Sequence, residues 1–285
     1  MKYDLISIGS ITKDIFVLTE RGKIFKTPKD KLALAWLGFE LGEKISVQEV
    51  VESAGGVATN LSLGTKKLGL NSFPVGPVKP ATSVIIVDKR TGERVIFYQK
   101  SSGAVNLKPL REKKAKYISV SSLTGNWNGQ ANEIMAYIKK NKAKLIVAPS
   151  TSMIREGYIS LKKLFSQSEI IFLNKNEATE IAFNEKNKTS NVGSLIKILH
   201  KLGPKIVCLT DGRKGAYCSD GRKIFHCPIQ KVKTVDVTGA GDAFASGFLG
   251  KYIKGGSIQE SLRMGIRNSA NVVRYVGTIR GLLKK

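Results

Sequence analysis

The chain has 285 residues, 42% of them hydrophobic, which is enough for a buried core, and no apolar run is long enough to predict a membrane span. Its 47 Lys and Arg against 22 Asp and Glu give a net charge of +25. The basic residues are scattered and accompany no nucleic-acid-binding module, so no specific nucleic-acid partner is expected. Cys208, Cys218 and Cys227 are an odd, widely spaced set that fits neither a disulfide framework nor a zinc site, and reduced thiols in a cytoplasmic protein are expected.

The first hundred residues predict short strands, at 1–8, 23–26, 84–87 and 94–98. The first of these runs is apolar but too short for a signal peptide. The turn-like residues 88–93 separate the last two runs as in a β-hairpin. Strands within 14–50 and 83–105 are therefore expected to protrude as a small lid.

Beyond residue 105, apolar strand-like runs alternate with helical patterns. The candidate strands lie at 117–120, 145–148, 170–173 and 206–209. The candidate helices lie at 130–140, 152–165, 175–183 and 190–202, with another from 243 to about 252. This alternation is typical of the α/β class, and we predict a mostly parallel central sheet flanked by helices in a single domain, 1–285.

A glycine-rich turn precedes the last of these helices. Gly239, Ala240 and Gly241 lie where a loop becomes a helix N-terminus, and their small side chains leave the backbone open to a ligand. Free N–H groups and the helix dipole favour a phosphate or a developing anion there. Asp242 follows in the first helical turn, where a carboxylate can take a hydroxyl proton. Read alone, these residues also fit a tight turn and an ordinary N-terminal cap.

The stretch 236–244, Asp-Val-Thr-Gly-Ala-Gly-Asp-Ala-Phe, resembles the C-terminal signature of the ribokinase-like, or PfkB, carbohydrate kinases and departs from it only at Val237. The resemblance extends over most of the chain and implies a ribokinase-like fold. It implies an ATP-dependent kinase that phosphorylates a hydroxymethyl group of a small sugar. Asp242 would be the general base, and the backbone of 239–242 would be the anion hole.

A second motif implies the substrate site. Residues 53–60 resemble the family's Gly-Gly-x-x-x-Asn motif, in which Gly55 and Gly56 would let the substrate lie against the backbone and Asn60 would contact its hydroxyls. Asp14, in a segment that resembles the loop after the first strand, is expected to accept hydrogen bonds from two substrate hydroxyls. Without the resemblance, the glycines fit a turn before a helix and Asp14 fits a surface or capping residue.

Two further segments imply the nucleotide and magnesium sites. Asn174 and Glu177 match the family's Asn-x-x-Glu motif, which helps to hold Mg²⁺ and phosphate oxygens, often through water. Thr210, Gly212 and Gly215 resemble a Thr-x-Gly-x-x-Gly segment near the ATP phosphates and ribose. Alone, the first segment fits an acidic helix start and the second a hairpin turn.

Other implied contacts lie near the C-terminus. Asn268 and Asn271 lie on a helix that resembles the family's adenine-side helix, so they are expected ATP contacts, although a buried helix face explains them equally well. The family often uses a monovalent cation such as K⁺ beside the segment that holds Asp236 and Thr238, which keeps that possibility open.

One region departs from the family. A Gly-x-Asp-x-x-Gly segment, a helix and a further strand usually occur where this chain has only residues 76–83, and Pro77 and Pro80 exclude a helix there. The shortening puts the substrate pocket in doubt, and it leaves open a homodimer through the lid strands.

Two alternatives to a sugar kinase stay open. The first is a nucleoside kinase of the same family, and lid side chains such as Phe97 and Tyr98 would decide between a sugar and a base. The second is of another class, a catalytically weak nucleotide-binding or regulatory protein. The shortened region motivates it, and the joint presence of Asp14, Asn60 and Asp242 argues against it.

Overall fold

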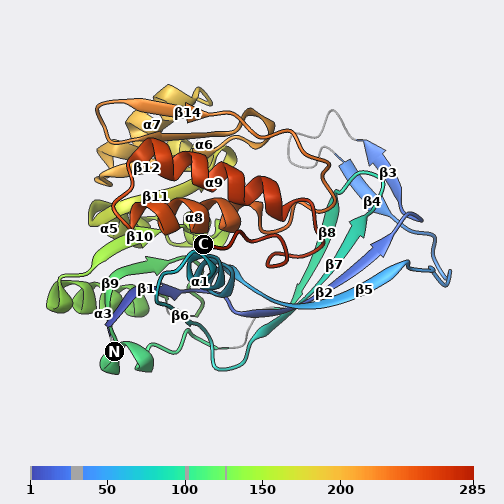
Figure 1. The fold of residues 1–285 in the computed structure, drawn as a ribbon, viewed down its shortest axis with the longest axis horizontal. Coiled ribbons are helices and arrows are strands. Elements are labelled where there is room, and N and C mark those ends of the chain that lie inside the picture. The colour runs from blue at the N-terminus through green and yellow to red at the C-terminus, as the bar shows by residue number, and fades with distance from the viewer. Residues whose placement is uncertain (1, 27–34, 100–102, 126) are drawn as a thin grey trace.

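The structure is a computed structural model that describes residues 2–26, 35–99, 103–125 and 127–285. Helices lie on both faces of a central eight-stranded sheet, and a smaller sheet projects from one end of this body (Figure 1). The predicted α/β class is confirmed, and so is the mostly parallel central sheet.

The central sheet has the strand order β14-β13-β12-β11-β10-β9-β1-β6. These strands are β1 (Lys2–Ile8), β6 (Ser72–Val75), β9 (Lys114–Val120), β10 (Lys144–Val147), β11 (Ser168–Asn174), β12 (Ile206–Thr210), β13 (Ala216–Ser219) and β14 (Ile224–Cys227). Pairing is parallel from β6 through β12, and antiparallel from β12 to β13 and from β13 to β14. The parallel strands therefore end at one edge, where Asn174 lies opposite Thr210.

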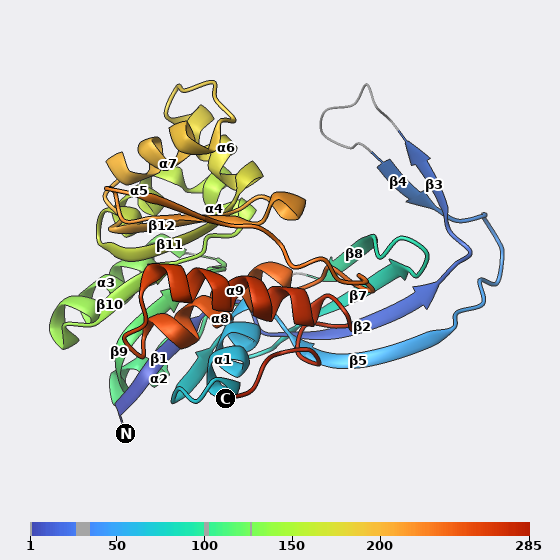
Figure 2. The same cartoon turned by 45° about the horizontal axis from the view of Figure 1, so that its top comes forward.

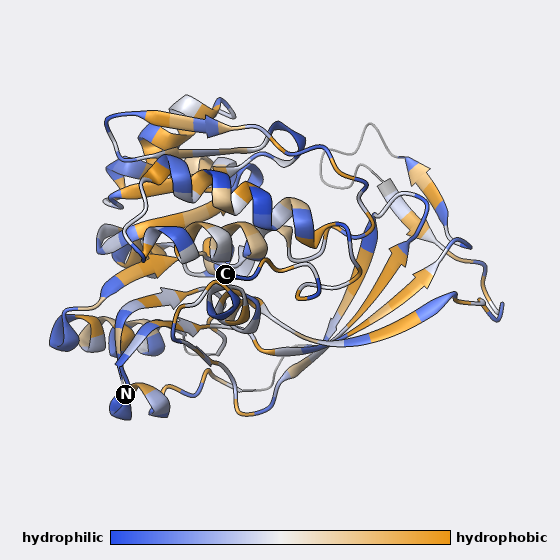
Figure 3. Ribbon diagram, viewed as in Figure 1, coloured by the Kyte–Doolittle hydropathy of each residue, from blue (hydrophilic) through white to orange (hydrophobic). Residues whose placement is uncertain are grey.

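The apolar runs form strands here because helices cover both sides of them (Figure 3). One face carries α3 (Trp127–Asn141), α4 (Thr151–Glu156), α5 (Tyr158–Ser166), α6 (Lys175–Asn184) and α7 (Val192–Lys201). The other carries α1 (Val57–Lys67), α8 (Ala240–Tyr252) and α9 (Ile258–Val272), and the short α2 (Lys108–Glu112) precedes β9. Successive residues of β11 point to opposite faces of the sheet. Ile171 packs in the hydrophobic core under α3 to α7, and Phe172 packs in the core under α1, α8 and α9.

All of the predicted helices form with bounds that differ by some residues, and for two of them the structure shows the cause. The segment predicted as one helix at 152–165 forms α4 and α5, which are separated by Gly157. A β-carbon at Gly157 would lie 1.6 Å from Cζ2 of Trp127, so the packed indole ring requires a glycine there. Helix α8 begins at Ala240, three residues earlier than predicted, because Gly239 caps it in the left-handed conformation with φ of 73°.

A four-stranded sheet forms the lid, with the order β5-β2-β7-β8. Its strands are β2 (Thr12–Thr19), β5 (Glu49–Gly55), β7 (Ala81–Asp88) and β8 (Arg94–Gln99). The predicted hairpin is confirmed as the β7–β8 pair, whereas the lid strands reach beyond the predicted bounds of 14–50 and 83–105. Strands β3 (Lys23–Lys26) and β4 (Ala35–Gly38) make a separate ribbon that extends past the lid (Figure 2).

The shortened region joins the two sheets directly. Strand β6 is the edge of the central sheet, and only residues 76–80 connect it to β7, without a helix, as the prolines predicted. Pro77 forms a β-bridge with Val105, and the Asn106 N–H donates to the Gly76 carbonyl. The segment before α2 thus packs beside this connection.

Cys208 and Cys218 are buried and face each other across β12 and β13, with their Sγ atoms 3.1 Å apart, and Cys227 is half-buried. The sequence spacing of Cys208 and Cys218 does not indicate that their thiols are in contact. The contact results from the register of the β12–β13 hairpin, which places the two residues opposite each other. Within the described residues, no helix combines the length and apolar character needed to cross a membrane.

Candidate active site

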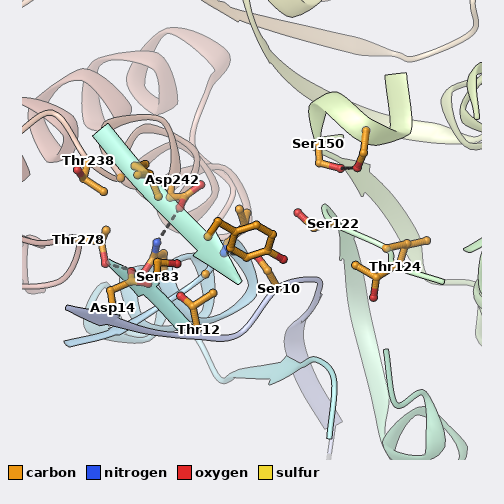
Figure 4. Close-up of a pocket in the computed structure, with 18 of the residues that line it drawn as sticks. Ser10, Thr12, Asp14, Ser83, Ser122, Thr124, Ser150, Thr238, Asp242 and Thr278 are labelled. Carbon is orange, nitrogen blue, oxygen red and sulfur yellow. Dashed lines mark hydrogen bonds between the residues drawn. The ribbon is translucent and has the colours of Figure 1, made fainter. Parts of the chain in front are cut away.

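A cavity of about 460 Å³ lies between the lid and the carboxyl edge of the central sheet (Figure 4). Lid strands β2, β7 and β8 line one wall, and the loops after β9 and β10 line the opposite wall. Its lining includes Ser10, Asp14, Asn60, Ser83, Tyr98, Ser122, Thr124, Ser150, Thr238, Asp242 and Thr278. We call this space the acceptor cavity.

A second cavity of about 310 Å³ adjoins it, and we call this one the donor cavity. Asn174, Glu177, Thr210 and Gly241 contribute to its wall, so it follows the carboxyl ends of β11 and β12. Both cavities share four lining residues, namely Val57, Ser122, Ser150 and Asp242. The Asp242 carboxylate therefore stands where the two spaces meet.

Asp242 lies in the first turn of α8, as predicted. Its Oδ2 accepts a hydrogen bond of 2.7 Å from Nδ2 of Asn60. Burial raises the pKa of Asp242 to about 6; the Asn60 hydrogen bond opposes this shift, and the nearby Asp14 adds to it. A carboxylate with this pKa is ionised at neutral pH and is a stronger base than an exposed aspartate.

The turn before α8 has room for an anion at one position. A β-carbon added to Gly241 would meet no atom within 4 Å, and this residue lines the donor cavity. At Gly239, the β-carbon would lie 2.7 Å from Cγ2 of Thr278, and the positive φ excludes most other residues. Ala240 is the first residue of the helix. Gly239 is thus required by the turn, whereas Gly241 leaves its backbone open to a ligand.

The predicted substrate residues come together at one end of the acceptor cavity. Asp14 is buried on β2, not in a loop as predicted, and burial raises its pKa while the hydroxyls of Thr12 and Ser83 lower it. A β-carbon at Gly55 would lie 1.8 Å from Oδ2 of Asp14. Gly56 caps α1 at φ of 85°, where a β-carbon would lie 2.4 Å from the Ser10 carbonyl oxygen. Both glycines are needed for this close packing of backbone and carboxylate.

Asn174 and Glu177 form a capping box at the start of α6. Oδ1 of Asn174 accepts from the Glu177 N–H at 2.9 Å, and Oε2 of Glu177 accepts from the Asn174 N–H at 2.8 Å. Burial raises the pKa of Glu177 to about 7, and Asp242 contributes to the shift. The cap engages Oε2 of Glu177, which makes Oε1 the candidate ligand for a hard cation.

The described part of the chain forms no protein cage for a metal in advance. Among the residues that the structure describes, no three His, Cys, Asp or Glu side chains are placed to hold an ion. Mg²⁺ usually takes one or two carboxylates together with phosphate oxygens of the substrate, so Glu177 beside the donor cavity fits this mode.

The segment after β12 holds the other predicted nucleotide residues. Thr210 lines the donor cavity. Gly212 and Gly215 belong to a tight turn, and the Gly215 N–H donates to the Gly212 carbonyl at 3.1 Å. Gly215 has φ of 91°, and its β-carbon would lie 2.1 Å from the Cys227 carbonyl oxygen, so this glycine serves the turn itself.

The structure places Asn268 in a buried helix face and not in the lining of either cavity. Asn268 is fully buried: its Nδ2 donates to the Ala243 carbonyl and to Oγ of Ser246, and its Oδ1 accepts from the Leu283 N–H. Asn271 likewise donates to the Gly281 carbonyl at 2.7 Å and lines neither cavity. Both amides hold the C-terminal segment against α9.

Asp236 is fully buried beside the same turn. Its Oδ1 accepts from the N–H and the hydroxyl of Thr238, and its Oδ2 accepts from the Gly277 N–H at 3.0 Å. No Lys, Arg or His pairs with this carboxylate within the described residues. A buried carboxylate without a cationic side chain fits a monovalent cation nearby.

Sequence reasoning missed most of the acceptor cavity. Tyr98 lines it, but Phe97 does not, because adjacent residues of β8 point to opposite faces of the lid. Trp127 and the hydroxyls of Ser122, Thr124 and Ser150 also line it, and no short motif marks them. One signal in the sequence could have indicated these hydroxyls: they lie in loops that follow predicted strands and precede helices. Parallel strands bring such loops to the same edge of the sheet.

The acceptor cavity is acidic, in contrast to the chain as a whole. Its charged lining residues are Asp14, Glu156 and Asp242, and no Lys, Arg or His is among the described residues that line it. The charged residues that line the donor cavity are likewise acidic, Glu177 and Asp242, so an anionic ligand in either cavity needs a cation or backbone N–H groups to balance its charge.

Comparison with known proteins agrees with this geometry. Residues 78–285 match the pfkB family of carbohydrate kinases. A cytidine kinase of Thermococcus kodakarensis is 29% identical over 255 residues, which cover 79% of this chain and 88% of the relative. An ATP-dependent 6-phosphofructokinase of Thermoanaerobacterium thermosaccharolyticum is 28% identical over 317 residues, which cover 98% and 90%.

The ribokinase of Arabidopsis thaliana, solved with ribose and ATP, matches the fold with a TM-score of 0.72 at 20% identity, over 100% of this chain and 96% of that one. Fold and relatives together define the class of small-molecule kinases. The chain belongs to the pfkB carbohydrate kinase family, as the stretch 236–244 indicated, and is a kinase of its sugar and nucleoside branch.

Proposed function

We propose that this kinase transfers the γ-phosphoryl group of ATP to a hydroxymethyl group of a small sugar, with Asp242 as the general base. The observation that carries the proposal is the position of Asp242 at the junction of the acceptor and donor cavities. A hydroxyl held in the first cavity can give its proton to Oδ1 of Asp242 and attack a phosphoryl group in the second.

The anion hole of the proposal is the backbone of Gly239, Ala240 and Gly241. Gly241, in the first turn of α8, lines the donor cavity, so the free N–H groups of that turn and the positive end of the helix dipole would face a phosphate there, although the Ala240 N–H itself donates to the Val237 carbonyl at 3.3 Å. These groups would stabilise charge on the transferring phosphoryl oxygens, while Asp14 and Asn60 hold hydroxyls of the acceptor. The end of the acceptor cavity around Asp14 is lined by the hydroxyls of Thr12 and Ser83, and this polar end supports an acceptor that carries a diol.

The acceptor is proposed to carry no phosphate of its own. Three carboxylates and no described basic side chain line the acceptor cavity, so a phosphorylated sugar would meet repulsion without a compensating cation. We therefore do not carry the substrate in the name of the 6-phosphofructokinase relative over to this chain.

A nucleoside is the second candidate acceptor, and one observation favours it. Tyr98 and Trp127 line the acceptor cavity together with Ile96 and Leu123, which gives a planar base apolar and aromatic surface. The cytidine kinase relative supports the same class. The ribose of a nucleoside would occupy the diol end near Asp14.

An ATP-consumption screen tests this proposal. It compares ribose, fructose and related sugars, nucleosides and the corresponding sugar phosphates, with Asp242→Asn as the blank. We expect an unphosphorylated sugar or a nucleoside to give turnover that the blank lacks. Turnover confined to phosphorylated sugars would overturn the acceptor class, and turnover by the blank within tenfold of the wild type would overturn the role of Asp242.

Mg²⁺ is proposed to lie between Glu177, Asn174 and the ATP phosphates, where it would neutralise phosphate charge. A monovalent cation is proposed beside Asp236 and Thr238. Replacing K⁺ by choline should lower the rate if that cation is used, and an unchanged rate would exclude it.

The outer face of the lid is proposed to pair with a second copy of the chain. Val50 and Phe97 are 57% and 58% exposed on this face, next to the half-buried Ile15 and Val84. An exposed apolar face of a sheet commonly packs against a partner. In a dimer with a twofold axis, the same face of both copies can form that contact. We also infer a cytoplasmic location, where ATP is available and thiols stay reduced.

A further inference from the structure

A buried hydrogen-bonded chain runs from the C-terminal loop to the proposed base (Figure 4). Oγ1 of Thr278 donates to Oδ1 of Asn60 at 2.7 Å, and Nδ2 of Asn60 donates to Oδ2 of Asp242 at 2.7 Å. Thr278 is only 3% exposed and Asn60 only 4%. Water therefore has little access to the Thr278–Asn60 bond, whereas the Asn60–Asp242 bond is half-buried at the junction of the two cavities.

Thr278 stabilises the orientation of the Asn60 amide in which Nδ2 faces the base. An amide has nearly the same shape after a 180° rotation, but only its oxygen accepts and only its nitrogen donates. The Asp242 carboxylate, which only accepts, selects the orientation in which Nδ2 faces it, and the Thr278 hydroxyl anchors the other end of the amide by donating to Oδ1. In the other orientation, the amide oxygen would face a carboxylate oxygen, which is repulsive.

The same threonine contacts the turn that precedes the base. A β-carbon at Gly239 would lie 2.7 Å from Cγ2 of Thr278, so the threonine methyl packs directly against that glycine. The neighbouring Gly277 N–H donates to Asp236 at 3.0 Å. The loop at 277–278 thus holds both the carboxylate of Asp242, through Asn60, and the backbone that leads to it.

We propose that Thr278 is a positioning residue for phosphoryl transfer, acting through Asn60 on the Asp242 carboxylate. This inference rests on the proposed role of Asp242 as the base. Within the described residues, the chain of bonds engages Oδ2 of Asp242 and leaves Oδ1 without a protein partner. Oδ1 is then free to accept the proton of the acceptor hydroxyl in a constant geometry.

Thr278→Val tests the inference, because valine keeps the shape and removes the hydroxyl. We expect kcat to fall by roughly 10- to 100-fold, as for a misplaced catalytic group, while KM for ATP stays within about twofold. Thr278→Ser should restore kcat to within about threefold of the wild type, since serine keeps the donor. If the valine variant does not fold, Thr278→Ala, which also lacks the hydroxyl, takes its place.

Thr65→Val is the matched control. Thr65 is also a buried threonine, its hydroxyl donates to the Leu61 carbonyl and bonds Oγ of Ser72, and it lines neither cavity. Its replacement should lower the melting temperature without lowering kcat. Equal losses of kcat in both variants would show a general structural effect and overturn the positioning role.

A double-mutant cycle identifies the route. In an Asn60→Ala background, Thr278→Val should change kcat by less than about twofold, because the intermediary is gone. A full additional loss would mean that Thr278 acts by another path.

The failure of this inference can be distinguished from the failure of the proposed function. If Asp242→Asn stays active, the proposed function itself fails. If Asp242→Asn is inactive while Thr278→Val retains wild-type kcat, only the positioning inference fails.

Discussion

Asp242 combines two properties that oppose each other. Burial that raises its pKa to about 6 makes it a better base, and the same burial makes its ionised form costly in the folded protein. The raised pKa stabilises the fold below about pH 4, and this contribution is lost as the pH rises through about 6. Activity and stability are thus in conflict at this residue.

Asp242→Asn should reveal the conflict directly. We expect turnover to fall by roughly three orders of magnitude or more, while ATP still binds, because the anion turn is unchanged. The free energy of unfolding should rise by roughly 1–3 kcal/mol at pH 8 and change little at pH 4, where the aspartate is already protonated. Denaturant unfolding at both pH values measures this, and a variant less stable than the wild type at pH 8 would refute it.

Gly241→Val tests the anion turn at a single position. A side chain there meets open space in the protein, so the fold should tolerate it, yet it would fill the place of a phosphate. We expect ATP affinity to fall by roughly tenfold or more, measured by calorimetry.

Gly193→Val is the control for that variant, since Gly193 is also the second residue of a helix, α7, and lines neither cavity. An ATP affinity of Gly241→Val equal to that of the control would contradict the role of the turn.

At the scale of elements, Asn174 and Glu177 at the start of α6 both cap the helix and line the donor cavity. The capping box of Asn174 and Glu177 satisfies N–H groups at the helix end, and it also fixes the second Glu177 oxygen beside the donor cavity. A helix cap read from the sequence and a metal ligand implied by the family are therefore compatible.

Glu177→Gln separates these uses. Glutamine can still accept from the Asn174 N–H, so the cap is kept, and because burial raises the pKa of Glu177 to about 7, removal of its charge should not lower the free energy of unfolding at pH 8. The loss of charge should raise the Mg²⁺ concentration for half-maximal rate by roughly tenfold. Rate measurements against Mg²⁺ concentration check this, and an unchanged requirement would remove Glu177 from the metal site.

For the whole molecule, the lid has one face toward the acceptor cavity and one open face. Alternation along β8 sends Tyr98 into the cavity and leaves Phe97 on the outside. An assembly through the open face would bury Phe97 in each copy.

Phe97→Asp should therefore convert a dimer into a monomer in sedimentation velocity, because a buried unpaired charge is unfavourable. Phe183→Asp is the control, since Phe183 is 64% exposed at the end of α6, far along the chain from the lid. A wild-type monomer, or a dimer that survives the Phe97 change, would contradict the assembly.

The α/β body and the candidate catalytic residue were both predictable. Strands such as 170–173 are continuous apolar runs, and the signature at 236–244 is local, so neither depends on distant contacts. The break at Gly157 and the inward face of Tyr98 were not predictable, because each depends on a partner far away in the chain. The buried position of Asn268 was one of the two alternatives that its helix left open.

Local order in this protein follows from residues that are neighbours in the chain: apolar runs make buried strands, and Gly-Ala-Gly-Asp makes a turn that opens onto a helix. Which side chains surround that turn depends on how the lid and the C-terminal loop fold back onto it. Asn60 and Thr278 are 218 positions apart in sequence and share a hydrogen bond with each other. Packing energy determines such contacts, and it exists only once the core has formed.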